Sequence, residues 1–164
     1  MLYIGDIIKA YDLDMHFYAD DGQIYSSCAP HVADHLQSRV IDCILNIKAW
    51  MASNRLMLNP SKTEFLWLST PRLKHLISRA PFKVDGVDIV PKSVIRLLGV
   101  LVDEVLSFDK HIGCLTRNCY YQLRRIRSIR RYIPTSVAIQ LVRALVLPRI
   151  DYCNSVLLGL PSSQ

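Results

Sequence analysis

MHFYADDGQIY, residues 15–25, is the stretch that decides how the first part of this 164-residue chain folds. Aromatic and β-favouring residues stand on both sides of Asp20-Asp21-Gly22, and an Asp-Gly pair is a strong signal for a tight hairpin turn. The residues therefore predict two short strands joined at Asp20–Gly22. His16–Ala19, which come just before, are too apolar for a free surface loop.

The two adjacent aspartates are the first candidates for chemistry. Like charges at a hairpin tip repel each other, and a fold retains such a pair more readily where a cation offsets the charge. Mg²⁺ takes hard oxygen ligands and binds through one or two carboxylates together with substrate phosphates. Asp20 and Asp21 meet that requirement. The alternative, which the dipeptide alone leaves open, is an exposed Asp-Asp-Gly turn without a ligand.

After the hairpin, the sequence predicts a helix and then a strand. Apolar residues recur at helical spacing from Leu36 to Met51, with Asp34 in the first turn and Asn54 at the end. Glu64–Ser69 has the composition of a strand, and Pro71 ends it. The helix is amphipathic, so we expect one of its faces to pack on a sheet.

Two more β segments complete the mixed part of the chain. Residues 82–90 predict a hairpin about Asp85-Gly86, and the apolar run 94–102 predicts a buried strand. Gly99 within that run is explained either by a bulge or by a close approach of the backbone to a ligand. Residues 1–107 therefore predict an α+β layer structure, with β-hairpins packed on an amphipathic helix.

The net charge of +6 is the sum of two parts of the chain whose net charges have opposite signs. Residues 1–109 hold 11 Lys or Arg against 13 Asp or Glu, whereas residues 110–164 hold 9 basic residues against one acid, Asp151. This asymmetry favours an acidic site in the first part and a surface for a polyanion in the second, with a phosphate backbone as the leading candidate.

The basic part is predicted to be helical. From Lys110 to Tyr132 apolar residues follow a 3-4 spacing, and Pro134 ends the helix. A second helix runs from Ser136 to Leu147, and Pro148 ends it. No acid interleaves with the arginines of the first helix, so we expect them to contact nucleic acid through its phosphates rather than to form a salt-bridged surface. The arginines in question are Arg117, Arg124, Arg125, Arg127, Arg130 and Arg131.

Composition excludes several classes of protein. With 51% hydrophobic and 21% charged residues, the chain is not collagen-like, disordered or a disulfide scaffold. The most apolar stretch, Val137–Leu147, is interrupted by Gln140 and Arg143 and is too short to span a bilayer, and the first residues do not resemble a signal peptide. The five cysteines include no CxxC pair, so we expect reduced, mostly buried thiols in a nuclear or cytoplasmic protein.

Several segments together resemble one family, the reverse transcriptases of non-LTR (LINE-type, jockey-like) retrotransposons. Phe17–Asp21 resembles the YxDD hairpin, motif C, and Leu58–Leu66 looks like motif D. The other resemblances are to the primer-grip region, in Leu97–Val100 with Asp103, Leu106, Phe108 and His111-Ile112, and to a thumb-side segment, in Asp151–Ser155. The order and spacing of these segments cover nearly the whole chain.

The resemblance implies RNA-directed DNA synthesis by two-metal phosphoryl transfer, with Mg²⁺, or Mn²⁺ in its place, as cofactor. It implies that Asp20 is the principal metal ligand and Asp21 its secondary partner, and that Tyr18 and Ala19 border the primer end and the incoming nucleotide. Lys62 matches the motif D lysine that assists pyrophosphate departure, although a solvated turn lysine is the alternative. Leu98 and Gly99 correspond to primer contacts, with Leu98 and Val100 also expected in the core. The implied partners are an RNA template, a DNA primer and a dNTP.

The resemblance begins after the motifs that supply the third catalytic aspartate and the fingers, motifs A and B. Asp12 and Asp14 precede the hairpin but have no counterpart as ligands in the family. We therefore interpret residues 1–107 as the C-terminal part of a palm, with motifs C, D and the primer grip, and residues 108–164 as a basic helical thumb-like region. The isolated chain is expected to be inactive. The alternatives are a non-catalytic basic nucleic-acid-binding module and a non-functional retroelement remnant.

Overall fold

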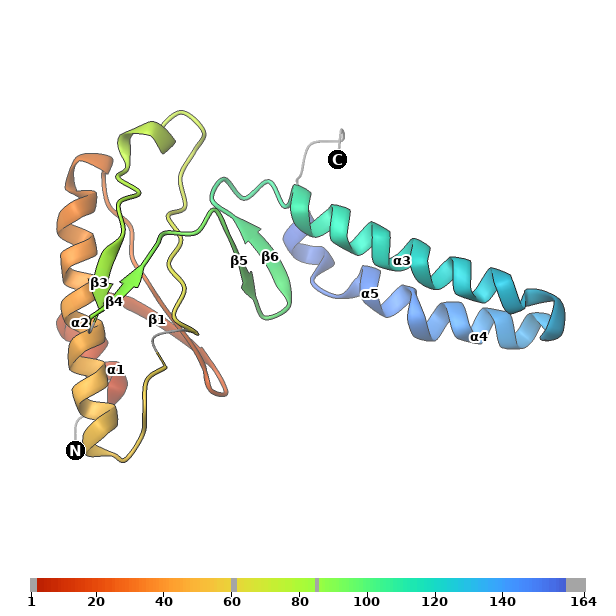
Figure 1. Cartoon of the computed structure of the whole chain (residues 1–164), viewed down its shortest axis with the longest axis horizontal. Coiled ribbons are helices and arrows are strands. Elements are labelled where there is room, and N and C mark those ends of the chain that lie inside the picture. The colour runs from red at the N-terminus through yellow and green to blue at the C-terminus, as the bar shows by residue number, and fades with distance from the viewer. Residues whose placement is uncertain (1–2, 60–61, 85, 159–164) are drawn as a thin grey trace. The chain divides into compact units, whose positions relative to one another are not determined.

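The computed structural model describes residues 3–59, 62–84 and 86–158, and the chain packs as two units, Met1–Ser93 (unit 1) and Val94–Gln164 (unit 2) (Figure 1). The elements of unit 1 are α1 (Ile4–Ala10), β1 (Asp14–Tyr18), β2 (Asp21–Tyr25), η1 (Pro30–Val32), α2 (Ala33–Ser53), η3 (Lys74–Leu76), β3 (Phe82–Val84) and β4 (Val87–Ile89). Those of unit 2 are β5 (Val94–Leu97), β6 (Val100–Asp103), α3 (Asp109–Ile129), η4 (Arg130–Tyr132), α4 (Thr135–Leu145), α5 (Leu147–Asp151) and η5 (Asn154–Leu157).

Helix α2 is the centre of unit 1 because it buries residues on two faces. Leu36, Cys43 and Ile47 pack with Ile8 of α1 and Leu13, and the β1–β2 hairpin adds partly buried side chains to this cluster. Burial raises the pKa of the Cys43 thiol. The periodicity from Leu36 to Met51 thus predicted the helix correctly, including Asp34 in its first turn and Asn54 at its C-terminal cap.

The second face of α2 packs against the β3–β4 hairpin. Phe82, Val84 and Ile89 form a buried cluster, and Ile41 and Ile44 of α2 lie against it. β3 and β4 pair antiparallel with Val84 opposite Val87, so the predicted hairpin is confirmed. Its turn residue Asp85 lies outside the described residues, as do Pro60 and Ser61 of the motif D segment. Mixed helices and antiparallel hairpins confirm the α+β class.

Three expectations about strands were wrong in detail. The β1–β2 turn is Ala19-Asp20, because Tyr18 pairs with Asp21, so Gly22 lies within β2 rather than in the turn. Glu64–Ser69 forms no strand. Among the described residues, its backbone bonds to another segment through the Lys92 N–H, which donates to the Phe65 carbonyl at 2.8 Å, and this bond does not make a strand pairing. The 94–102 run is not one strand but two, β5 and β6, joined at Leu98-Gly99.

Unit 2 consists of the β5–β6 hairpin followed by helices. α3 and α4 run antiparallel side by side, joined through η4 and Pro134 (Figure 1), and bury Cys119, Ile126 and Ala138. The predicted helix from Lys110 to Tyr132 is confirmed as α3 and η4, and the second helix as α4. In the packing, the division falls after Ser93, so residues 94–107 belong with the helices. The palm and thumb assignment of 1–107 and 108–164 stays a prediction.

Among the described residues no helix is long and apolar enough to cross a bilayer. The five cysteines are free thiols. Cys43 and Cys119 are buried, Cys114 and Cys153 are half-buried and Cys28 is exposed, so the expectation that most of them lie in the core was wrong.

Candidate metal site and nucleic-acid interface

The tip of the β1–β2 hairpin presents the two aspartates to solvent. Ala19 and Asp20 make a two-residue turn, with Ala19 in the left-handed region at φ 55°, and Asp21 is the first residue of β2. Gly22 was expected in the turn, but it lies in β2, and packing explains the glycine at this position. It lies opposite Phe17, and a Cβ at Gly22 would come within 2.6 Å of the Phe17 Cε1 atom. The aromatic ring therefore lies over Gly22 and occupies the space that a side chain would need there.

Asp20 and Asp21 are exposed, and neither carboxylate makes a hydrogen bond or an ion pair with another described residue. Two adjacent carboxylates suit a hard divalent cation such as Mg²⁺, which takes its remaining oxygen ligands from water and phosphate. The described residues contain no cluster of three or more His, Cys, Asp or Glu side chains. The donor set among the described residues thus fits two ligands of a magnesium site, with no third protein ligand clustered beside them.

Asp12 and Asp14 do not supply that ligand. Asp14 pairs with Tyr25 at the open end of the hairpin, four residues along β1 from Tyr18, which places it about 14 Å from the tip. The Asp12 carboxylate instead lies 3.3 Å from the Arg39 guanidinium. Because carboxylate ligands lie about 2 Å from Mg²⁺, neither residue shares a cation with Asp20.

Lys62 is exposed and follows the two undescribed residues of the motif D segment. Its backbone N–H donates to the Asn59 carbonyl at 3.1 Å, as expected for a turn. No hydrogen bond or ion pair among the described residues joins Lys62 to Asp20 or Asp21. The structure therefore does not join Lys62 to either aspartate by a polar contact.

The Leu98-Gly99 turn has an unusual backbone and an external support. Leu98 has φ 45° and Gly99 has φ 88°, so both turn residues are left-handed, as in the tight turns that match strand twist. Gly99 is therefore a turn residue, and the bulge interpretation was wrong. Val100 is buried as expected, whereas Leu98 is only half-buried.

Tyr152 holds this turn from 54 residues away. Its hydroxyl donates to the Leu98 carbonyl at 2.5 Å, and a Cβ at Gly99 would lie 3.5 Å from the Tyr152 ring. From the sequence, Tyr152 was placed in the thumb-side segment Asp151–Ser155, but its side chain was given no role. No local signal could have found it, because the contact joins two distant segments.

The connection from β6 to α3 is organised by a buried carboxylate. Asp103 accepts hydrogen bonds from the backbone N–H groups of Val105 (3.1 Å), Ser107 (3.0 Å) and Phe108 (2.7 Å) and from the Ser107 hydroxyl (3.1 Å). Burial alone would raise the pKa of Asp103, but these hydrogen bonds to the ionised form outweigh it and lower the pKa below its usual value. Asp103 thus fixes the start of α3.

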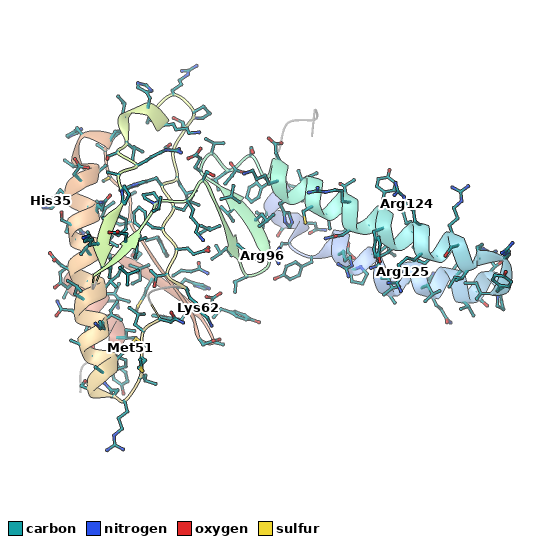
Figure 2. The ribbon with its side chains drawn as sticks, in the orientation of Figure 1. His35, Met51, Lys62, Arg96, Arg124 and Arg125 are labelled. Carbon is teal, nitrogen blue, oxygen red and sulfur yellow. The ribbon has the colours of Figure 1, made fainter. Side chains whose placement is uncertain are left out.

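The outer face of α3 carries its cations. Lys110, Arg117 and Arg124 are spaced seven residues apart, which is nearly two full helical turns, so they form a line with steps of about 10.5 Å. This line lies opposite the buried residues Cys119 and Ile126, and Figure 2 shows Arg124 and Arg125 on α3.

The six predicted arginines are all exposed, and none forms an ion pair with a described residue. Arg125 lies 5.8 Å from the Tyr121 ring centroid and Arg131 lies 4.7 Å from that of Tyr132. Arg130 differs from the rest, because its guanidinium donates to the Ile133 carbonyl at 3.0 Å and to the Thr135 hydroxyl at 2.7 Å. Arg130 therefore also closes the turn between α3 and α4.

A curated relative of the chain is an RNA-directed DNA polymerase. Together with the hairpin motif, this similarity identifies the chain as a reverse-transcriptase-like region of the non-LTR retrotransposon type. The relative is the probable RNA-directed DNA polymerase from transposon BS of Drosophila melanogaster, 31% identical over 112 residues. The match covers 67% of this chain but 12% of that polymerase. No protein-family profile and no solved structure matches the chain.

Proposed function

We propose that the chain is part of an RNA-directed DNA polymerase and that its β1–β2 hairpin supplies two ligands of the metal site. The observation that carries the proposal is the pair of exposed carboxylates, Asp20 and Asp21, at the tip of a two-residue turn in a chain related to a transposon polymerase. The hairpin tip offers these groups to substrate phosphates without a competing partner among the described residues.

Asp20 is the principal ligand in this proposal and Asp21 the secondary one. When bound, Mg²⁺, or Mn²⁺ in its place, would activate a primer 3′-hydroxyl and stabilise charge on the departing pyrophosphate. Tyr18, 65% exposed beside the turn, and Ala19, with its small side chain, border the primer end and the incoming dNTP. The lack of a Cβ branch at Ala19 leaves room there for a nucleotide.

Two further elements are assigned to substrate in the same reaction. Lys62 supplies a positive charge or a proton at the departing pyrophosphate. The Leu98-Gly99 turn contacts the primer, and an exposed glycine lets a backbone approach closely. Tyr152 positions this turn through its hydrogen bond to the Leu98 carbonyl.

Helix α3 binds the RNA template and DNA primer through their phosphates. The line of cations from Lys110 to Arg124 supplies charge without base specificity, because arginine and lysine contacts to phosphate fix position rather than sequence. Each phosphate contact on a duplex contributes about 0.9 to the slope of log K against log salt. Arg→Ala changes on an exposed helix face preserve helix propensity, so they remove charge selectively.

An RNA–DNA hybrid therefore tests the α3 interface by fluorescence anisotropy over a range of salt concentrations. Arg124→Ala/Arg127→Ala is expected to lower the salt slope by about 1.8, for two lost phosphate contacts. Arg143→Ala/Arg149→Ala is the matched control, because it removes two positive charges from α4 and α5 and is expected to leave the slope unchanged. Equal slopes in all three proteins would contradict the interface.

A primer-extension assay tests the metal site. Because the described residues cluster no third carboxylate with Asp20 and Asp21, we expect no Mg²⁺-dependent extension of a DNA primer on an RNA template by the 164-residue polypeptide alone. Extension that Asp20→Ala abolishes would overturn the need for a further ligand while supporting the enzyme.

A non-catalytic nucleic-acid-binding module is the second candidate, favoured by exposed cations of α3 that form no ion pair with a described residue. It predicts the same salt-dependent hybrid binding, with affinity unchanged in the presence of Mg²⁺ by Asp20→Ala. The polymerase proposal predicts that Mg²⁺ strengthens binding of a primer end and that Asp20→Ala removes this effect.

A further inference from the structure

Residues 70–84 form a basic segment of unit 1 that belongs to none of the polymerase motifs. The segment contains no acid, although residues 1–69 hold 8 Asp or Glu against 5 Lys or Arg. Its basic residues are Arg72, Lys74, His75, Arg79 and Lys83. The sign of the charge therefore changes abruptly along the chain at this point.

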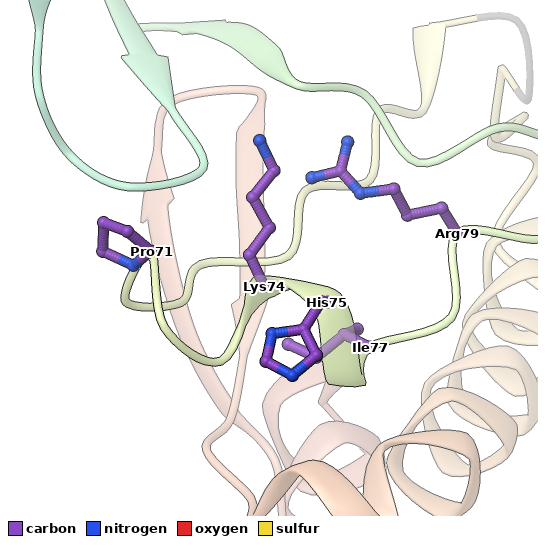
Figure 3. A pocket seen from close by; sticks show the side chains of 5 residues that line it. All are labelled: Pro71, Lys74, His75, Ile77 and Arg79. Carbon is purple, nitrogen blue, oxygen red and sulfur yellow. The ribbon is translucent and has the colours of Figure 1, made fainter.

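Three of these side chains line one hollow on the surface, which we call the 71–79 hollow. Its lining is Pro71, Lys74, His75, Ile77 and Arg79, and its volume is about 460 Å³ (Figure 3). Lys74 and Arg79 leave the chain at different points of the loop, and Figure 3 shows their side chains pointing toward one another.

Backbone hydrogen bonds hold the loop that forms the hollow. The N–H groups of Leu73 and Lys74 donate to the Thr70 carbonyl at 3.0 and 3.2 Å, and Leu76 N–H donates to the Leu73 carbonyl at 2.9 Å. These bonds form a turn and the short η3 helix, so Lys74 and His75 leave the backbone from a fixed segment. The hollow is therefore a built feature of the loop.

The chemistry of the lining selects an anion with several oxygens. A guanidinium donates in a planar fork that matches two phosphate oxygens, an ammonium adds a compact positive charge, and an imidazole adds an N–H donor. The lining consists of three basic and two apolar residues and itself contains no carboxylate. Pro71 and the half-buried Ile77 add apolar surface against which a sugar can pack.

The shape of the hollow decides which phosphate compound fits. Sites for free nucleotides enclose most of their ligand. The cationic side chains of the 71–79 hollow are all exposed, so it leaves a bound molecule largely in solvent. A nucleic-acid strand that runs across the surface and places one or two phosphates in the hollow needs no enclosure.

We propose that the 71–79 hollow binds the phosphodiester backbone of a nucleic-acid strand, as a second contact in addition to α3. The assignment rests on the proposed function in one respect, since nucleic acid is the polyanion that a polymerase region meets. Lys74 and Arg79 carry the contact, and His75 adds a donor.

Anisotropy of a fluorescent single-stranded RNA of about 20 nucleotides, long enough for a binding groove, measures the contact on the full chain. Lys74→Ala/Arg79→Ala is expected to lower the slope of log K against log salt by about 1.4, or about 0.7 for each phosphate lost from a single strand. Arg72→Ala/Lys83→Ala is the matched control, because it removes two exposed cations from the same segment that do not line the hollow. The control is expected to keep the slope of the unmodified chain.

The proposal would be overturned if Lys74→Ala/Arg79→Ala and Arg72→Ala/Lys83→Ala had the same salt slope, either because both lose phosphate contacts or because neither does. Inorganic tripolyphosphate separates the two sources of phosphate. We expect it not to displace the RNA at equal phosphate concentration, and displacement would assign the hollow to free polyphosphate instead. The Arg124→Ala/Arg127→Ala variant distinguishes the two claims. If the salt slope falls in this variant but not in Lys74→Ala/Arg79→Ala, the hollow alone is refuted. If it falls only in Lys74→Ala/Arg79→Ala, the α3 interface alone is refuted.

Discussion

Replacing Asp103 tests how the β6–α3 connection is held. Asp103 is 8% exposed, and its carboxylate accepts four hydrogen bonds, of which the one from Phe108 N–H is buried. Leu106 and Phe108 have φ of 56° and 59°, so the loop follows an unfavourable path that these bonds must offset. Asp103→Ala removes every acceptor at once.

The expected cost follows from these contacts. Leaving the buried Phe108 N–H unsatisfied costs about 1–3 kcal/mol, and the partly exposed donors of Val105 and Ser107 recover bonds to water at a smaller loss. We expect Asp103→Ala to lower the free energy of unfolding by about 3 kcal/mol, and Asp103→Asn, which keeps one acceptor oxygen, by about half of that. Urea denaturation followed by circular dichroism measures both values.

The pH dependence has a defined sign. Because hydrogen bonds lower the pKa of Asp103 in the folded state, its ionised form stabilises the fold fully above the ordinary aspartate pKa. This contribution is lost as the pH falls through the lowered pKa, and Asp103→Asn lacks it. The difference in stability between the unmodified chain and Asp103→Asn should therefore shrink in acid.

Asp151→Asn is the control, because it changes an exposed carboxylate in the same unit and should alter stability by no more than about 0.5 kcal/mol. If Asp103→Ala also stayed within that range, the assignment of the loop to Asp103 would be refuted.

Three further outcomes are expected. Tyr152→Phe, which removes the hydroxyl bonded to the Leu98 carbonyl, should lower unfolding free energy by about 1 kcal/mol in urea titrations; an unchanged midpoint would show that the bond is not formed. Gly99→Ala forces an L side chain to φ 88° and should cost about 1–2 kcal/mol by the same assay, against no loss if the turn relaxes. In the native chain iodoacetamide should modify exposed Cys28 before Cys43, whose pKa burial raises, as followed by mass spectrometry; equal rates would contradict the packing of α2.

The helices could be predicted from sequence because their periodic apolar residues are a local record of which face is buried. The apolar spacing from Leu36 to Met51 predicted α2, and the 3-4 spacing of apolar residues after Lys110 predicted α3. The existence of the first hairpin was equally local. The position of its turn was not predicted correctly. Gly22 lies beneath the ring of Phe17 on the paired strand, but in the sequence an Asp-Gly pair looks like a turn.

Strand pairing was the less predictable part. Glu64–Ser69 has β-favouring residues, and Phe65 packs edge-on against Phe82, but composition does not reveal whether a neighbouring backbone completes a ladder. The contact of Tyr152 with Leu98 likewise depends on how unit 2 folds back on itself. Asp20 and Asp21 are predicted as metal ligands from the motif alone, and the structure adds their exposure and their place at the turn.

The most direct test of the proposed function is whether the hairpin tip binds a divalent cation. Mn²⁺, a paramagnetic substitute for Mg²⁺, can be titrated into the isotopically labelled chain while NMR signals of backbone amides are followed. We predict selective broadening at Tyr18–Gly22 that Asp20→Asn/Asp21→Asn abolishes and that Asp12→Asn/Asp14→Asn leaves in place. Broadening that is absent from the tip, or that survives loss of Asp20 and Asp21, would contradict the assignment of these aspartates as metal ligands.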